Sequence, residues 1–92
     1  MKEKMIKAQA SLMARASVLM MTSKDVQVWT SCHPNIGSFR FEFADLVSLD
    51  FDDDNPYNEL QVSDAIKAMD DAIEEAYEKA QNTIQFINSW RG

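Results

Sequence analysis

Residues 63–90 constrain the fold of this chain most, because they contain neither Gly nor Pro. Ser63 is a favourable N-cap, and Asp64 places a negative charge in the first turn, where it suits the helix dipole. Apolar residues recur every three or four positions and form one stripe, made of Ile66, Met69, Ala72, Ile73, Ala76, Tyr77, Ala80, Ile84 and Ile87. The pattern predicts one long helix with a single buried side.

The other side of this helix is acidic. Five carboxylates fall within nine residues, namely Asp70, Asp71, Glu74, Glu75 and Glu78. They give roughly one charge per 2.7 Å of helix axis, whereas duplex DNA presents about one per 1.7 Å, or about one per 3.4 Å along each strand. Further carboxylates lead into this helix, namely Asp52, Asp53, Asp54, Glu59 and Asp64. Two interpretations stay open: a row that imitates phosphates, or a solvated face with Lys67–Asp71 and Glu75–Lys79 as i,i+4 pairs.

The length of this helix also matters. A compact chain of 92 residues has a radius of gyration near 12 Å, whereas 28 helical residues span roughly 42 Å. The helix must therefore overhang, bend or end early, and a bend is most expected at residues 81–83, where weak helix formers follow one another. If it stays straight, the end with Ile84, Phe86, Ile87 and Trp90 needs a partner, which favours a homodimer.

Upstream, residues 3–21 have helical spacing of apolar residues, at Met5, Ile6, Leu12, Met13, Ala16, Leu19 and Met20. Lys2, Lys4, Lys7 and Arg15 also fit a basic membrane-surface helix. We favour a core helix with methionines as filler, because Ala and Ser stand where a membrane helix would carry bulky residues.

The middle of the chain alternates with period two, which predicts antiparallel strands. In residues 25–33, one face takes Val26, Val28, Thr30 and Cys32, and the other takes Gln27, Trp29, Ser31 and His33. Residues 34–37 supply turn chemistry, with Asn35 and Gly37 able to take positive φ. In residues 38–44, Phe39, Phe41 and Phe43 share a face that the helices must cover.

Residues 45–51 alternate again and predict a third strand, with a short helical turn as the alternative. We therefore expect one α+β domain over residues 1–92: a two-layer sandwich with an N-terminal helix, an antiparallel hairpin extended by this strand, and a long C-terminal helix.

Charge is distributed unevenly. Residues 1–40 carry a net charge of +4 and residues 41–92 a net charge of −10. A nucleic-acid binder needs a basic patch, so direct binding of DNA or RNA is not expected. The single cysteine, Cys32, forms no intrachain disulfide and suits a reducing cytoplasm, and no run approaches the ~20 apolar residues of a membrane span.

No cluster of residues indicates a reaction, so we expect neither catalysis nor a cofactor. Asp50, Asp52 and Asp54 match the first calcium-loop ligands, but Asn55 and Gln61 replace its Gly and Glu, so no metal is expected. Cys32 and His33 point to opposite strand faces and cannot share one reacting atom.

Trp29 is a different kind of candidate. The alternation turns it outward beside Arg40 and Glu42, which is the composition of an interface hot spot. The alternative is a Trp folded over the sheet edge.

In size, acidity and helix–hairpin–helix order the chain resembles small phage-encoded inhibitors of bacterial defence, the anti-CRISPR and anti-restriction proteins that act as DNA mimics. The resemblance implies a non-catalytic protein that occupies the nucleic-acid groove of a host protein. On charge and exposure, the residues predicted to bind that partner are Asp52, Asp53, Asp54, Asp70, Asp71, Glu74, Glu75, Glu78 and Trp29. The alternative is a structural or adaptor domain that dimerises through its C-terminal helix and binds a protein partner.

Overall fold

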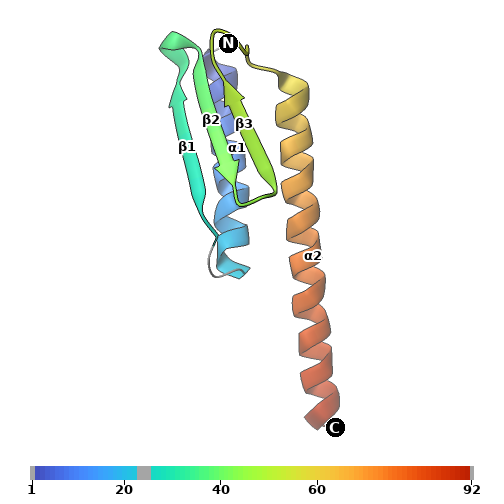
Figure 1. The fold of residues 1–92 in the computed structure, drawn as a ribbon. Helices are drawn as coiled ribbons and strands as arrows, with labels where there is room; N and C mark the ends of the chain where they lie inside the picture. Colours follow the sequence, from blue (N-terminus) through green and yellow to red (C-terminus); the bar gives the residue numbers. More distant parts are fainter. Residues whose placement is uncertain (1, 23–25, 92) are drawn as a thin grey trace.

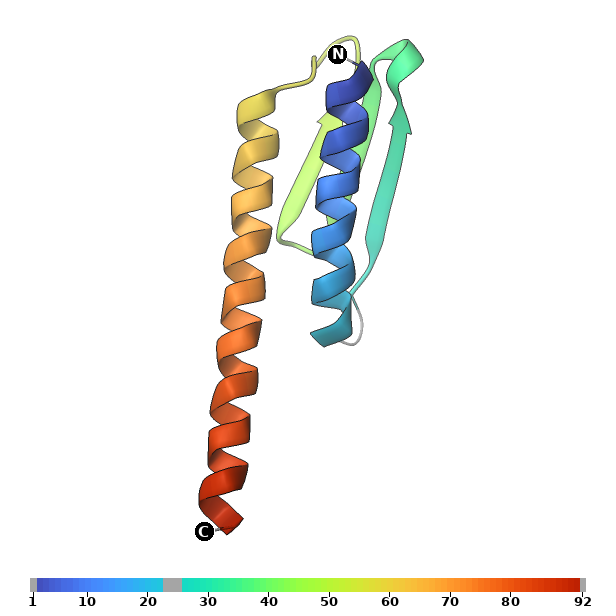
Figure 2. The ribbon, with the colours of Figure 1, turned by 180° about the vertical axis from the view of Figure 1, so that it is seen from behind.

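The chain folds into two layers: a three-stranded sheet and two helices on one of its faces (Figures 1 and 2). The computed structural model describes residues 2–22 and 26–91, and side chains as far as residue 82. The elements run α1 (Lys2–Thr22), β1 (Val28–His33), a 3-10 turn (Pro34–Ile36), β2 (Ser38–Phe43), β3 (Val47–Phe51) and α2 (Glu59–Arg91). The predicted α+β sandwich is confirmed, including its third strand.

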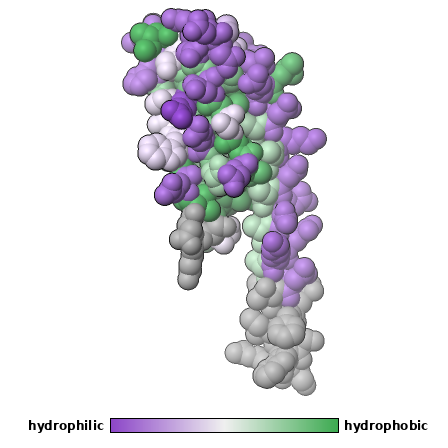
Figure 3. All heavy atoms as spheres, in the orientation of Figure 1, coloured by the Kyte–Doolittle hydropathy of each residue, from purple (hydrophilic) through white to green (hydrophobic). Residues whose placement is uncertain are grey.

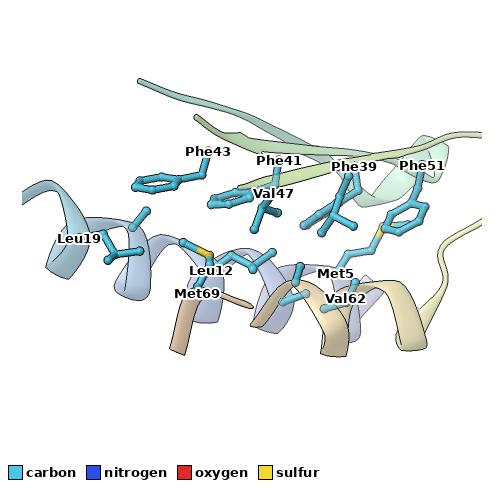
Figure 4. Packing of buried hydrophobic residues seen from close by; sticks show 14 residues of the cluster. Met5, Leu12, Leu19, Phe39, Phe41, Phe43, Val47, Phe51, Val62 and Met69 are labelled. Carbon is cyan, nitrogen blue, oxygen red and sulfur yellow. The ribbon is translucent and has the colours of Figure 1, made fainter. Parts of the chain in front are cut away.

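The sheet is antiparallel in the order β1-β2-β3, and its helix-facing side forms the core. Phe41 lies opposite Leu49 and Phe43 lies opposite Val47, so the alternating apolar residues of β2 and β3 share one face. Figure 4 shows the phenylalanines of this face above Met5 and Leu12 of α1 and Val62 and Met69 of α2. At one end Tyr57 closes the core, with its ring centroid 5.3 Å from that of Phe51.

The two helices lie side by side and run in the same direction, as two ion pairs demonstrate. Lys4 pairs with Glu59 and Arg15 pairs with Asp70, and in both pairs the partners are 55 residues apart. By this register the end of α1 at Thr22 is level with residue 77 of α2. We call residues 78–91 the overhang, and the sheet, α1 and residues 59–77 the body.

The overhang gives the molecule its shape. At about 1.5 Å per residue it extends roughly 21 Å beyond the body. The chain measures 60 × 23 × 19 Å and has a radius of gyration of 16.5 Å, against the ~12 Å of a compact chain. Helix α2 continues through residues 81–83, so of the three options, overhang, bend or early end, the structure takes the overhang. The side chains of Ile84, Phe86, Ile87 and Trp90 lie outside the described residues.

The predicted N-cap at Ser63 is also wrong, because α2 begins at Glu59. Asn58 caps it: its Oδ1 accepts the N–H groups of Leu60 at 2.9 Å and Gln61 at 3.2 Å. Ser63 lies inside the helix, one turn further on.

Three smaller expectations are corrected. In α1, Ile6 and Met20 are exposed instead of buried, and Met21 is 86% exposed, so two of the four described methionines of α1 are core filler and two are not. Strand β1 begins at Val28 instead of residue 25. Of the two turn residues, Gly37 takes positive φ (66°) while Asn35 lies in the 3-10 turn.

Candidate partner-binding face of α2

Helix α2 presents carboxylates on the side turned away from the core. Val62, Ala65 and Met69 are buried against α1 and the sheet, which fixes the inward direction of the helix. At 100° per residue, positions 71, 74, 75 and 78 fall within about 100° of one another on the opposite side. All four side chains are exposed, and we call Asp71, Glu74, Glu75 and Glu78 the outer acidic face. Figure 3 shows hydrophilic residues along this edge of α2.

Asp70 does not belong to that face, which corrects the predicted row of five carboxylates. One residue before Asp71, it is turned by about 100° towards α1. Arg15 donates from Nε to Asp70 Oδ1 at 2.7 Å and from Nη2 to Oδ2 at 3.4 Å, and from Nη1 to the carbonyl of Ser11 at 3.0 Å. The charge of Asp70 is therefore balanced within the molecule. The helical phase of Asp70 is the signal that could have separated it from its neighbours.

The outer acidic face keeps most of its charge. Glu75 Oε1 lies 3.7 Å from Lys79 Nζ. Both side chains are exposed to solvent, so this ion pair is weak and neutralises little of the charge that the face presents to a partner. Within the described side chains, no cation lies within 4 Å of Asp71, Glu74 or Glu78, so the predicted Lys67–Asp71 pair is not formed. The four carboxylates give about one charge per 3 Å of axis, close to one strand of DNA. Lys67 shares this side of the helix and lowers its net charge.

The acidic residues before α2 form a separate cluster. Asp52, Asp53 and Asp54 are exposed in the connection from β3 to α2. Asp52 Oδ1 accepts the N–H groups of Asp54 at 2.9 Å and Asn55 at 2.8 Å, so this carboxylate also builds the turn. The start of α2 at Glu59 is twelve residues, or about 18 Å, from Asp71. The predicted carboxylates therefore make two clusters instead of one row.

Trp29 points outward, which is one of its two expected placements, and it is 65% exposed. It lies opposite Glu42 on the sheet face away from the helices, where Arg40 donates to Glu42 at 3.1 Å. Strand β1 is at the edge of the sheet furthest from α2 (Figure 1). Trp29 and the outer acidic face therefore belong to different sides of the molecule.

An open groove that the sequence did not indicate lies where α2 leaves the body. It has a volume of about 670 Å³ and lies between the end of α1, the β2–β3 turn and α2. Leu19, Phe43, Leu46, Ala72, Ala76 and Ala80 contribute apolar walls, with Glu75 and Lys79 at the α2 side. The groove could not be predicted from the sequence, because its residues come from three separate parts of the chain. Only those on α2 belong to a recognisable pattern, the apolar stripe of that helix.

The structure places Cys32 and His33 on opposite faces of the sheet. Cys32 lies opposite Phe39 on the core side of the sheet while His33 lies opposite Ser38, and partial burial raises the pKa of the Cys32 thiol. Among the described residues no group of three or more His, Cys, Asp or Glu side chains could hold a metal ion, and none of the helices has the length and apolar character of a membrane span.

Comparison of the chain with protein-family models, curated proteins and solved structures gave no match. Its function must therefore be argued from its own surfaces.

Proposed function

We propose that this chain is a non-catalytic acidic protein that docks its outer acidic face in the nucleic-acid groove of another protein and thereby inhibits it. The observation that carries the proposal is the spacing of Asp71, Glu74, Glu75 and Glu78, which are exposed, face one way and approach the charge density of one DNA strand. In the cytoplasm of a bacterial host, an inhibitor of the phage anti-CRISPR or anti-restriction kind would act in this way.

The mechanism is electrostatic. A groove lined by Lys and Arg attracts a rigid line of carboxylates as it attracts phosphates, so association is fast and weakens with salt. The helix holds the four charges in a fixed geometry, which avoids the ordering cost of a flexible acidic tail. A groove that also reached Asp52, Asp53 and Asp54 would have to extend about 18 Å along α2.

The test needs a partner captured on the full chain from a bacterial lysate at low salt and identified by mass. We expect the purified partner to be released by short duplex or single-stranded DNA, because both ligands would occupy one groove. We also expect the variant Asp71→Asn, Glu74→Gln, Glu78→Gln to bind at least tenfold more weakly.

The matched control removes the same charge from exposed positions away from α2, as Glu3→Gln, Asp45→Asn, Asp50→Asn. It should bind within about twofold of the parent chain, because only net charge changes. Equal losses in the two variants, or a partner that DNA does not displace, would contradict the proposal.

A further inference from the structure

The chain exposes more surface than a compact monomer of its mass. Its accessible surface is 6828 Å², whereas a folded monomer of 10.5 kDa exposes roughly 5,400 Å². The excess of about 1,400 Å² exceeds the ~800 Å² that each partner buries in a standard interface. The elongated shape, 60 Å along its longest axis and 19 Å along its shortest, accounts for a surface larger than that of a compact chain.

The inner side of α2 stays apolar as it leaves the body. Ala72 and Ala76 are half-buried beside the groove, and Ala80, on the same side, is exposed. The same three-or-four spacing continues in the sequence at Ile84 and Ile87. Figure 3 shows apolar residues on the inner edge of α2 below the sheet. An apolar stripe that continues beyond the hydrophobic core of its own domain is typical of a helix that packs against another helix.

The charge distribution along α2 favours a second α2 helix, running antiparallel, as the partner of the apolar stripe. Residues 70–79 of α2 carry a net charge of −4, whereas residues 80–91 contain no acidic residue and one Arg. Two copies paired in parallel would bring the two −4 segments together. Two copies paired antiparallel would place each −4 segment beside the neutral-to-basic end of the other helix, which removes that repulsion.

From these observations we infer that two copies of this chain pair antiparallel through their α2 overhangs, so that the end of each helix enters the groove of the other. With the two-fold axis near residue 82, residues 84–91 of one copy lie level with residues 73–80 of its partner. This span contains four of the α2 residues that line the groove, Glu75, Ala76, Lys79 and Ala80. Both grooves are then filled by one symmetric contact, as expected of an isologous dimer.

The first test measures the mass of the full chain by sedimentation equilibrium over a concentration series. We expect a dimer, and we expect Ala80→Glu to weaken dimerisation at least tenfold by placing a charge on the stripe. Asn82→Glu is the matched control: it adds the same charge two residues on, about 200° around the helix, and should change dimerisation less than twofold. Both positions are exposed, so circular dichroism should find the two variants equally folded.

The second test fixes the direction of pairing in a Cys32→Ser background. For an axis near residue 82, the two copies of residue 80 are about 6 Å apart along the helices, and those of residue 72 about 30 Å. A short bismaleimide should therefore link Ala80→Cys into dimers but not Ala72→Cys, which a monofunctional maleimide should still label in dilute solution.

A monomer at concentrations up to about 1 mM, or equal effects of the two charge variants, would overturn the inference. Equal cross-linking at residues 72 and 80 would overturn the antiparallel geometry. None of these measurements involves a nucleic-acid-handling partner, so failure here leaves the proposed inhibition untouched, and failure of the inhibition leaves the dimer untouched.

Discussion

At the scale of single residues, the neighbours Asp70 and Asp71 have different roles because one helical step turns them about 100° apart. Asp70 meets the half-buried Arg15, and Asp71 faces outward. We expect Asp70→Ala to lower the free energy of unfolding by about 0.5–1 kcal/mol, the value of a partly exposed ion pair. We expect Asp71→Ala to be neutral or slightly stabilising, because it removes repulsion from nearby carboxylates. Urea denaturation of both variants measures the difference, and equal losses would mean that the Arg15 pair contributes nothing.

The other pair between the helices predicts a pH dependence. The hydrogen bond from Lys4 lowers the pKa of Glu59 from its ordinary value, and the charge of Lys4 adds to this effect. A lowered folded-state pKa stabilises the fold above the unfolded pKa, and this stabilisation is lost as the pH falls through the folded pKa. An NMR titration should place the Glu59 midpoint below that of an unpaired glutamate, and Lys4→Met should raise it. An unchanged midpoint in that variant would show that Lys4 is not the cause.

At the scale of elements, the start of α2 gives the sharpest comparison between the sequence pattern and the structure. Asn58 accepts two helix N–H groups, and Ser63 lies a turn inside the helix. We expect Asn58→Ala to cost about 1 kcal/mol of stability and Ser63→Ala less than about 0.5 kcal/mol. Thermal unfolding monitored by circular dichroism measures both. A larger loss at Ser63 would place the cap where the sequence first indicated it.

Strands were easier to predict from the sequence than helix ends. The strands followed from period-two alternation, because Phe41 and Leu49 must face one way to be buried. The helix start did not, because Asn58 and Ser63 are equally good caps, and the four residues between them do not decide the choice. For the exposed methionine Met20, spacing alone misled, because α2 covers one flank of α1 and leaves the other open. The outward direction of Asp71, Glu74, Glu75 and Glu78 followed from helical periodicity, whereas the pairing of Asp70 did not, because its partner Arg15 comes from another element.

At the scale of the whole molecule, the 55-residue separation between facing positions of α1 and α2 predicts an order of folding. The strands pair with sequence neighbours through short turns, whereas the helices meet only after a long loop closes, at a cost in chain entropy. We expect the three-stranded sheet to be largely formed in the transition state for folding, and α1 to dock on the sheet afterwards.

Two buried leucines give a matched test of that order, Leu49 in β3 and Leu12 in α1. Each Leu→Ala change should cost about 2–5 kcal/mol. Stopped-flow chevrons should show Leu49→Ala mainly slowing folding and Leu12→Ala mainly speeding unfolding. The reverse assignment would mean that the helices come together first. If this order holds, the contact between α1 and the sheet forms last and opens first. Release of α1 would then expose Phe39, Phe41 and Phe43 to proteases.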